Sequence, residues 1–392
     1  MFKKNEHDDL IVTHFADDYN TYLGAVVPPV FMNSLHVFDT IEDYYDTPKF
    51  VKDKYVYGRV SNPTVSIVEQ KVAALERGAM ALCFGSGMAA MTSAIMAVCK
   101  SGDHIICIRN IYGPTKLFLT DYVAPRLNMT VTFVGGQDIC EVEEAICSNT
   151  ALIILESPTS LVFNVIDIKA VTDLAKKHGI RTCIDNTYCT PVFQKPIDMG
   201  VDLVMHTASK YLGGHSDIIA GVLVSSDKEL MKKIAMQERE WFGGILGPME
   251  AWLMMRGIRT LPLRVKAHFE SALKVAEYLE KHSRVRKVNY PALKSHPDYD
   301  IMEKQQDGCA GLLSFEVDAD VDAAKKVSNG LNLFKTGVSW GGFESLTFMP
   351  FLKFDDQEIE WLGSAQNLIR IHIGLEGTDN LIEDLEQSLS KL

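Results

Sequence analysis

The sequence predicts an α/β protein in which a mostly parallel sheet carries helices on both faces. Short apolar runs alternate with segments of helical periodicity from residue 79 to about residue 221, which is the pattern of consecutive βαβ units. The chain has 392 residues, more than one ordinary hydrophobic core accommodates, so more than one domain is expected.

The first 60 residues are predicted to form an N-terminal arm. They contain Pro28-Pro29, several aromatic residues and little sustained periodicity, and we expect such an arm to cross to a neighbouring subunit. Helical spacing begins at Val65 and continues through Leu75. Gly78 is the expected C-terminal stop of that helix.

Seven apolar runs are predicted to be strands, over residues 79–84, 104–108, 130–134, 151–155, 180–184, 202–205 and 218–224. The segment from Gly78 to Cys99 carries no charge and is long enough to span a bilayer. Gly85-Ser86-Gly87 interrupts it, however. A buried strand followed by a buried helix is therefore the better interpretation.

The second half of the chain begins with helical patterns over residues 248–256 and 263–281. Strand-like segments at 311–317 and 368–373 then mix with helical ones at 321–328 and 380–389. We expect an arm over 1–60, a main domain over 61–257 and a smaller α+β domain over 258–392.

Composition narrows the class of protein. The net charge is −12 and basic residues do not cluster, which argues against a nucleic-acid partner. None of the eight cysteines forms a CxxC pair, so no metal site or disulfide framework is expected. Free thiols and a charged N-terminus without a signal-peptide pattern favour a cytoplasmic protein without a membrane segment.

Lys210 lies in the stretch His206–Asp217, directly after the strand-like run 202–205 and between Thr207 and Ser209. Ligands of α/β proteins commonly bind where strands end. A lysine held there beside two hydroxyl groups suits a Schiff base with a phosphorylated aldehyde. The alternative is a surface lysine in a polar loop.

Gly85-Ser86-Gly87-Met88 follows a strand and opens a helix, so its N–H groups and the helix dipole favour a phosphate. The spacing from Gly85 to Ala90 also fits a dinucleotide fingerprint. That fingerprint needs an acid at the end of the next strand, where this chain has Arg109-Asn110. A nicotinamide oxidoreductase is therefore disfavoured.

Asp185 ends the strand-like run 180–184. A carboxylate at that position can keep a pyridine nitrogen protonated, so that the ring accepts electrons from a carbanion; alternatively, Asp185 caps a turn through Asn186. Together with Lys210 and the upstream phosphate loop, it predicts a pyridoxal 5′-phosphate enzyme with the cofactor bound in residues 61–257.

These motifs resemble the Cys/Met-metabolism family of pyridoxal-phosphate enzymes. The likeness rests on Ser209–Asp217 and Asp185-Asn186-Thr187 and runs from about Tyr22 to the C-terminus. It implies an aspartate-aminotransferase-like architecture (fold type I) with a seven-stranded, mostly parallel sheet and a smaller C-terminal domain. It also implies a homotetramer built from dimers that share their active sites.

By this resemblance, Lys210 forms the Schiff base, Asp185 pairs with the pyridinium nitrogen, and Arg370 clamps the substrate carboxylate. Arginine suits that role because its planar fork binds a carboxylate bidentately. Tyr112 would stack on the ring and assist proton transfers. The resemblance assigns the cofactor phosphate to Gly87, Met88, Thr207 and Ser209 of one chain with Tyr57 and Arg59 of its partner.

Ser339-Trp340, Ser160 and Tyr112-Gly113-Pro114 resemble the bacterial cystathionine β-lyase branch, and Ser339 and Trp340 would contact substrate. Gly85–Met88 and Asn62-Pro63-Thr64 match the general family better. We expect α,β-elimination of cystathionine or a related thioether, which yields a thiol such as homocysteine together with pyruvate and ammonia. This reaction would belong to transsulfuration for methionine biosynthesis. The alternatives are a γ-lyase or γ-replacing enzyme, such as methionine γ-lyase, and a non-catalytic binding protein, which the intact set of Lys210, Asp185 and Arg370 disfavours.

Overall fold

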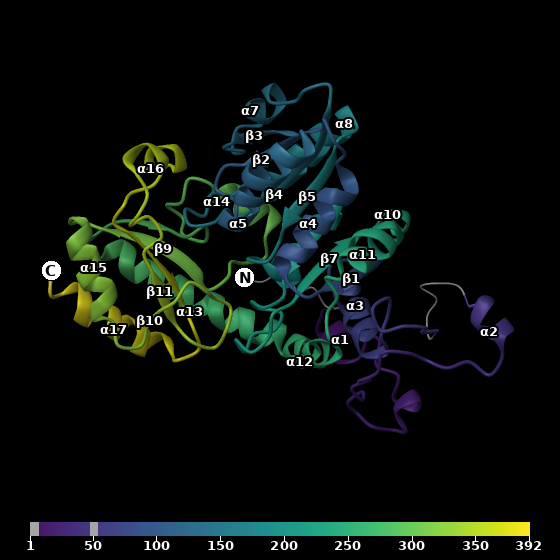
Figure 1. Cartoon of the computed structure of the whole chain (residues 1–392). Coiled ribbons are helices and arrows are strands. Elements are labelled where there is room, and N and C mark those ends of the chain that lie inside the picture. Colours follow the sequence, from purple (N-terminus) through teal and green to yellow (C-terminus); the bar gives the residue numbers. More distant parts are fainter. Residues whose placement is uncertain (1–7, 48–53) are drawn as a thin grey trace.

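A computed structural model describes residues 8–47 and 54–392. It contains two sheets connected by a long helix (Figure 1). The larger sheet has seven strands in the order β1-β7-β6-β5-β4-β2-β3. Their bounds are β1 Met80–Phe84, β2 His104–Ile108, β3 Thr130–Val134, β4 Thr150–Glu156, β5 Arg181–Asp185, β6 Leu203–Thr207 and β7 Gly221–Ser225. The predicted α/β class and seven-stranded sheet are confirmed.

The larger sheet is parallel from β3 to β6, whereas β7 runs antiparallel to both β6 and β1. No helix lies between β6 and β7; residues 208–220 form turns and loop, and Lys210 lies within them. A parallel partner needs a crossover, usually helical, of a dozen or more residues. The non-helical return therefore agrees with the reversed direction of β7 and leaves a loop at the end of β6.

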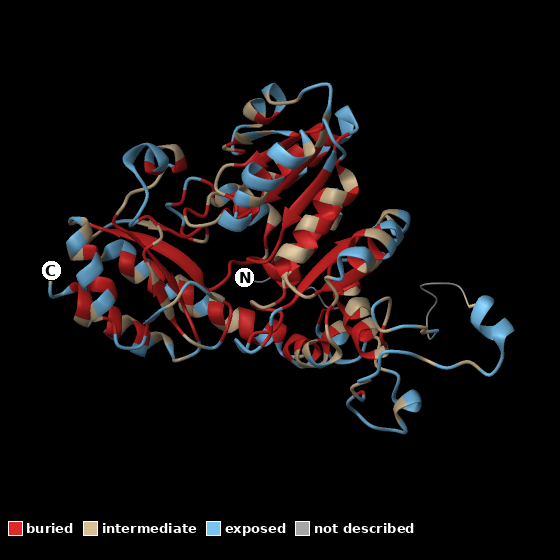
Figure 2. Ribbon diagram, in the orientation of Figure 1, coloured by how far each residue is buried: buried red, intermediate tan, exposed pale blue. Residues whose placement is uncertain are grey.

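Helices cover both faces of the larger sheet, and the strands between them are mostly buried (Figure 2), except for the edge strand β3. The longer ones are α3 Pro63–Leu75, α4 Gly87–Val98, α8 Ile168–His178, α10 Lys228–Ile234 and α12 Pro248–Ile258. The shorter ones are α5 Gly113–Leu117, η2 Phe118–Val123, α6 Ala124–Leu127, α7 Ile139–Glu144, α9 Thr190–Phe193, η3 Pro196–Met199, η4 Ala235–Arg239 and α11 Glu240–Phe242. The uncharged segment 78–99 is thus a strand followed by a helix, as predicted. Among the described helices, none has the length and apolar character needed to cross a bilayer.

The end of α3 differs from the prediction. The left-handed residue is Arg77, with φ of 57°, and not Gly78. Gly78 closes the turn by donating its N–H to the Ala73 carbonyl at 2.8 Å. A Cβ at Gly78 would lie 2.4 Å from Val224 Cγ1, so the glycine is needed for close approach to β7 and not for its backbone angle.

The smaller sheet has the order β10-β11-β12-β9-β8. Its strands are β8 Val285–Asn289, β9 Leu312–Val317, β10 Lys335–Thr336, β11 Leu346–Phe348 and β12 Leu368–His372, and the accompanying helices are α13 Leu261–Lys281, α14 Tyr299–Gln305, α15 Val321–Gly330, α16 Asp356–Leu362 and α17 Thr378–Leu389. The sequence pattern did not indicate β8, β10 or β11. Two of these are only two or three residues long, and β8 leaves most of its residues partly or fully exposed.

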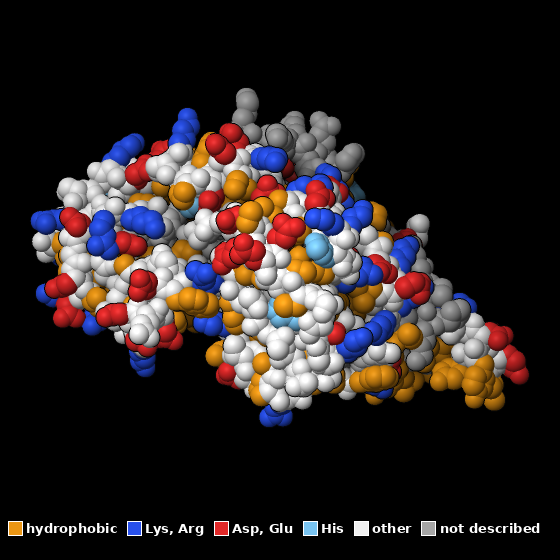
Figure 3. All heavy atoms as spheres, turned by 90° about the horizontal axis from the view of Figure 1, so that it is seen from above, with side chains coloured by type: hydrophobic (Ala, Val, Ile, Leu, Met, Phe, Trp, Pro, Cys, Tyr) orange, Lys and Arg blue, Asp and Glu red, His pale blue; other side chains and the backbone are white. Residues whose placement is uncertain are grey.

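The N-terminal arm contains α1 Asp8–Thr13, η1 Tyr19–Tyr22 and α2 Ile41–Tyr45. Its first part is fixed to the main body by buried ion pairs of Asp8 with Lys195 and of Asp17 with Lys71. Its later part extends away from the body (Figure 1). Hydrophobic and acidic side chains lie together at that end of the molecule (Figure 3). Ile41, the first residue of α2, is 71% exposed.

Candidate functional site

A cavity of about 520 Å³ opens at the carboxyl ends of the central parallel strands. The last residues of β4, β5 and β6 are Glu156, Asp185 and Thr207, and all three line it. Ligands of open α/β sheets bind at this edge. The smaller domain closes the cavity with Arg370 of β12 and the loop that precedes β11.

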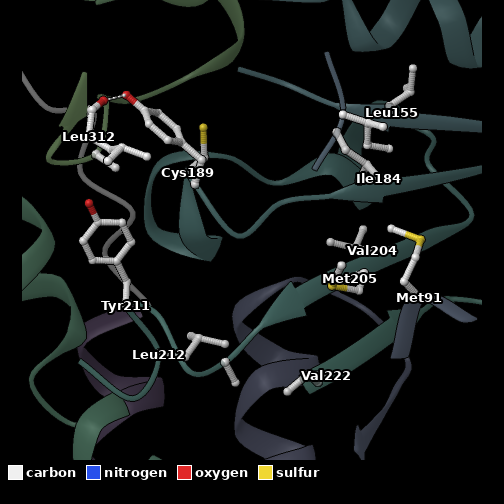
Figure 4. Close-up of a cluster of buried hydrophobic side chains, with 14 of the residues drawn as sticks. Met91, Leu155, Ile184, Cys189, Val204, Met205, Tyr211, Leu212, Val222 and Leu312 are labelled. Atoms are coloured by element: carbon white, nitrogen blue, oxygen red, sulfur yellow. Dashed lines mark hydrogen bonds between the residues drawn. The ribbon is translucent and has the colours of Figure 1, made fainter. Parts of the chain in front are cut away.

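Lys210 is held in the cavity by its neighbours in the sequence. Tyr211 and Leu212 are 1% and 2% exposed and lie in the hydrophobic core (Figure 4). The Tyr211 hydroxyl accepts the Gly311 N–H at 2.8 Å. Because the two residues after Lys210 are anchored in this way, the lysine side chain is directed into the cavity.

The Lys210 ammonium lies against the Ser339–Trp340 wall. Nζ donates to Ser339 Oγ at 2.7 Å and lies 5.4 Å from the centre of the Trp340 ring. Burial, reinforced by Arg370, lowers the pKa of Lys210 to about 8, against the opposing attraction of Asp185. A neutral amine is therefore accessible near neutral pH, which both a nucleophile and a general base require.

The N-terminus of α4 forms the floor of the cavity beside β6. Ser86 Oγ accepts the Ala89 N–H at 3.0 Å, and the N–H groups of Gly87 and Met88 have no intrahelical partner because they open the helix. A Cβ at Gly87 would lie 2.0 Å from Thr207 Oγ1, so only glycine lets the helix end reach Thr207. Ser209 also lines the cavity and its Oγ accepts the Ala220 N–H. This arrangement of N–H groups and hydroxyls fits a phosphate.

Asp185 is buried, and its Oδ1 accepts hydrogen bonds from the N–H and the hydroxyl of Thr187. Burial raises the pKa of Asp185 despite these donors and the nearby Lys210 and His206. Among the described residues, no cation lies within ion-pair distance of this carboxylate. A pyridinium N–H of bound pyridoxal phosphate would supply that charge, so the site fits the cofactor.

Tyr112 and Arg370 face the cavity from two domains. Tyr112 is 46% exposed, and burial, with Asp185 next, raises the pKa of its hydroxyl. Arg370 Nη2 donates to the Val338 carbonyl at 2.7 Å. Burial lowers the pKa of Arg370 to about 10, which leaves the guanidinium charged at neutral pH and able to bind a carboxylate.

Tyr57 and Arg59 do not line the cavity of their own chain. The Arg59 guanidinium lies 5.7 Å from the Tyr57 ring centre, and Nη1 pairs with Glu240 at 3.3 Å. Both side chains are exposed. Their expected contribution to the site of a neighbouring subunit stays a prediction.

Glu156 is a residue of the site that was not predicted from the sequence. Its two oxygens accept the Ser160 hydroxyl at 2.5 Å and the Tyr112 N–H at 2.9 Å, so it connects two residues of the site. Burial, with Asp185 next, raises the pKa of Glu156 to about 8. The signal was present, because Glu156 ends an apolar run just as Asp185 does.

Comparison with known proteins agrees with this geometry. Residues 10–390 match the family model of the Cys/Met metabolism PLP-dependent enzymes. The L-methionine γ-lyase of Porphyromonas gingivalis is 38% identical over 94% of each chain, and the cystathionine γ-lyase of Bacillus subtilis is 38% identical over 94% of this chain and 95% of its own. The cystathionine β-lyase of Lactococcus lactis subsp. cremoris is 36% identical over 97% of this chain and 98% of its own. The chain belongs to the Cys/Met-metabolism family of pyridoxal-phosphate-dependent enzymes.

Proposed function

We propose that the protein is a carbon–sulfur lyase that eliminates a thiol from the β-carbon of an amino-acid thioether such as cystathionine. The observation that carries the proposal is the cavity shared by Lys210, Asp185 and Arg370, with Ser339 and Trp340 beside Lys210 Nζ. Cystathionine is expected to give homocysteine, pyruvate and ammonia.

Bound pyridoxal phosphate supplies an electron sink for the negative charge that develops when Cα loses its proton. Arg370 binds the substrate carboxylate, which fixes the orientation of Cα. Lys210 Nζ removes the Cα proton, and the hydrogen bond to Ser339 Oγ holds Nζ in position. The proton can then pass to the departing sulfur, from Nζ or with the help of the Tyr112 hydroxyl.

Trp340 supports β-elimination over γ-elimination. Its ring packs on Tyr211 with centres 5.6 Å apart, and Tyr211 is itself anchored in the core. The ring therefore limits how far Lys210 Nζ can move on that side. β-Elimination removes one proton, from Cα. γ-Elimination also removes a proton from Cβ, so Lys210 Nζ would have to move further.

A γ-lyase is the second candidate, because relatives named methionine γ-lyase and cystathionine γ-lyase have identities similar to that of the β-lyase relative. Exchanging Trp340 for leucine tests the choice. Trp340→Leu should raise the proportion of 2-oxobutyrate relative to pyruvate when cystathionine is the substrate. Trp361→Leu is the matched control, since Trp361 packs on Phe133 and does not line the cavity. Equal product ratios in the wild type and both variants would refute the role of Trp340.

We further propose a homotetramer of site-sharing dimers that acts in the cytoplasm in methionine biosynthesis. The exposed Tyr57 and Arg59, outside their own cavity, support shared sites. The arm carries further exposed apolar side chains, such as Val37 at 88%, that a neighbouring subunit would cover. We assign the arm to residues 1–60, the cofactor domain to 61–257 and the smaller domain to 258–392.

A further inference from the structure

The loop that carries Ser339 and Trp340 is attached to strand β12 at two points. Its Val338 carbonyl accepts a hydrogen bond from Nη2 of Arg370 at 2.7 Å. Three residues later, the Gly341 N–H donates to Nε2 of His372 at 3.1 Å. Arg370 and His372 are two residues apart on one strand, so their side chains lie on the same face of the sheet.

His372 bonds the loop in either neutral tautomer. With the proton on Nδ1, Nε2 accepts the Gly341 N–H and Nδ1 donates to the Gly311 carbonyl at 3.2 Å. With the proton on Nε2, that nitrogen donates to the Gly342 carbonyl at 3.2 Å. Burial lowers the pKa of His372 to about 3, so the ring is uncharged at neutral pH. His372 thus connects the loop to Gly311, whose N–H donates to the Tyr211 hydroxyl.

The position of Gly341 shows why this connection affects the site. Its φ is +88°, and a Cβ there would lie 2.8 Å from Tyr211 N and 3.0 Å from Lys210 Cα. The loop backbone therefore packs directly on the backbone of Lys210. A shift of Gly341 would move Ser339, which accepts the hydrogen bond from Lys210 Nζ, and Val338, which binds Arg370.

We propose that His372 is a positioning residue that fixes the loop of residues 338–342 on Lys210 and thereby sets the geometry with which Arg370 and Ser339 receive the substrate. The inference rests on the proposed lyase function of the same cavity. It concerns how the site is held and does not depend on whether elimination occurs at the β- or the γ-carbon.

The test compares His372→Leu with His372→Gln in the full-length holoenzyme. The leucine removes the acceptor for the Gly341 N–H, and we expect KM for the thioether substrate to rise roughly tenfold or more. Hydrogen exchange of a peptide that contains residues 338–342 should accelerate in the same variant. Glutamine is long enough to offer an amide oxygen to Gly341, and should restore both quantities to within about threefold of the wild type.

His268→Leu is the matched control. His268 is fully buried, its ring centre lies 5.3 Å from that of His372, and its Nδ1 bonds the Ile373 carbonyl and not the loop. Unchanged KM and loop exchange in this variant support the proposal, whereas changes equal to those of His372→Leu would show a general packing effect and overturn it. If His372→Leu does not fold, His372→Asn replaces it, because the shorter asparagine amide does not reach Gly341. Equal KM and equal loop exchange in the asparagine and glutamine variants would refute the positioning role of His372.

Loop exchange needs no turnover, which separates this inference from the proposed reaction. Accelerated exchange in His372→Leu, with rescue by glutamine, supports the positioning role even in an enzyme that proves to be a γ-lyase. Unchanged exchange in an active β-lyase would refute the positioning role alone.

Discussion

Replacement of Arg370 by lysine should raise KM steeply while the protein stays folded. Arg370 Nη2 already bonds the Val338 carbonyl at 2.7 Å, which leaves Nη1 and Nε for the substrate carboxylate. A lysine has one ammonium group on a flexible side chain, so a single nitrogen must donate to both the Val338 carbonyl and the substrate carboxylate. The loss of one charge-assisted hydrogen bond, ~1.5–3 kcal/mol, corresponds to a roughly 10- to 150-fold rise in KM.

The assay is steady-state thiol release from cystathionine by holoenzyme. Arg286→Lys is the control, because Arg286 also binds a carboxylate through two nitrogens, with Glu316, but lies at β8 outside the cavity. KM should be unchanged in that variant. An unchanged KM in Arg370→Lys would refute the assignment of the carboxylate to Arg370.

Three further predictions concern assembly, pH and stability. Arg59→Ala should weaken cofactor retention, and mixing it with Lys210→Ala should restore part of the activity if subunits share sites; a fully active monomer in sedimentation would contradict this. Only the neutral amine of Lys210 attacks an aldehyde, and burial lowers the pKa of this lysine to about 8. The rate at which the cofactor-free protein takes up pyridoxal phosphate should therefore rise with pH up to about 8 and then level off. A rate that still rises at pH 10, near the usual lysine pKa, would show an unperturbed lysine. Asp17→Ala removes the carboxylate partner of the fully buried Lys71 and should lower the free energy of unfolding by ~3–5 kcal/mol. Asp173→Ala removes only an exposed i,i+4 pair with Lys169 and should cost about 0.5 kcal/mol or less; equal losses in chemical denaturation would refute this difference.

Much of the larger sheet could be predicted because most of its strands are buried on both faces. Such strands appear as continuous apolar runs, and the predicted run 104–108 coincides with the fully buried strand β2. The predicted run 130–134 coincides with β3, although this edge strand is partly exposed. Lys210 and Asp185 could be placed at one edge for the same reason, because parallel strands end on the same side of a sheet. The short strands β10 and β11 carry no such pattern, since their pairing is set by tertiary contacts.

The contacts that join distant segments around the site could not be predicted from the sequence. Glu156 meets Tyr112 and Ser160 through turns whose course local patterns do not specify. The contact of His372 with Gly341 joins a strand to a loop 31 residues earlier. Nothing in the sequence near Gly341 indicates that its missing side chain makes room for Lys210.

The reaction that we propose is β-elimination by Lys210 in a cavity walled by Ser339 and Trp340. The most direct measurement is identification of both products after incubation of the pyridoxal-phosphate-loaded wild-type enzyme with cystathionine, with Lys210→Ala as the inactive control. We predict pyruvate and homocysteine in equal amounts. Predominant 2-oxobutyrate and cysteine would contradict the claim and assign the enzyme to the γ-lyases.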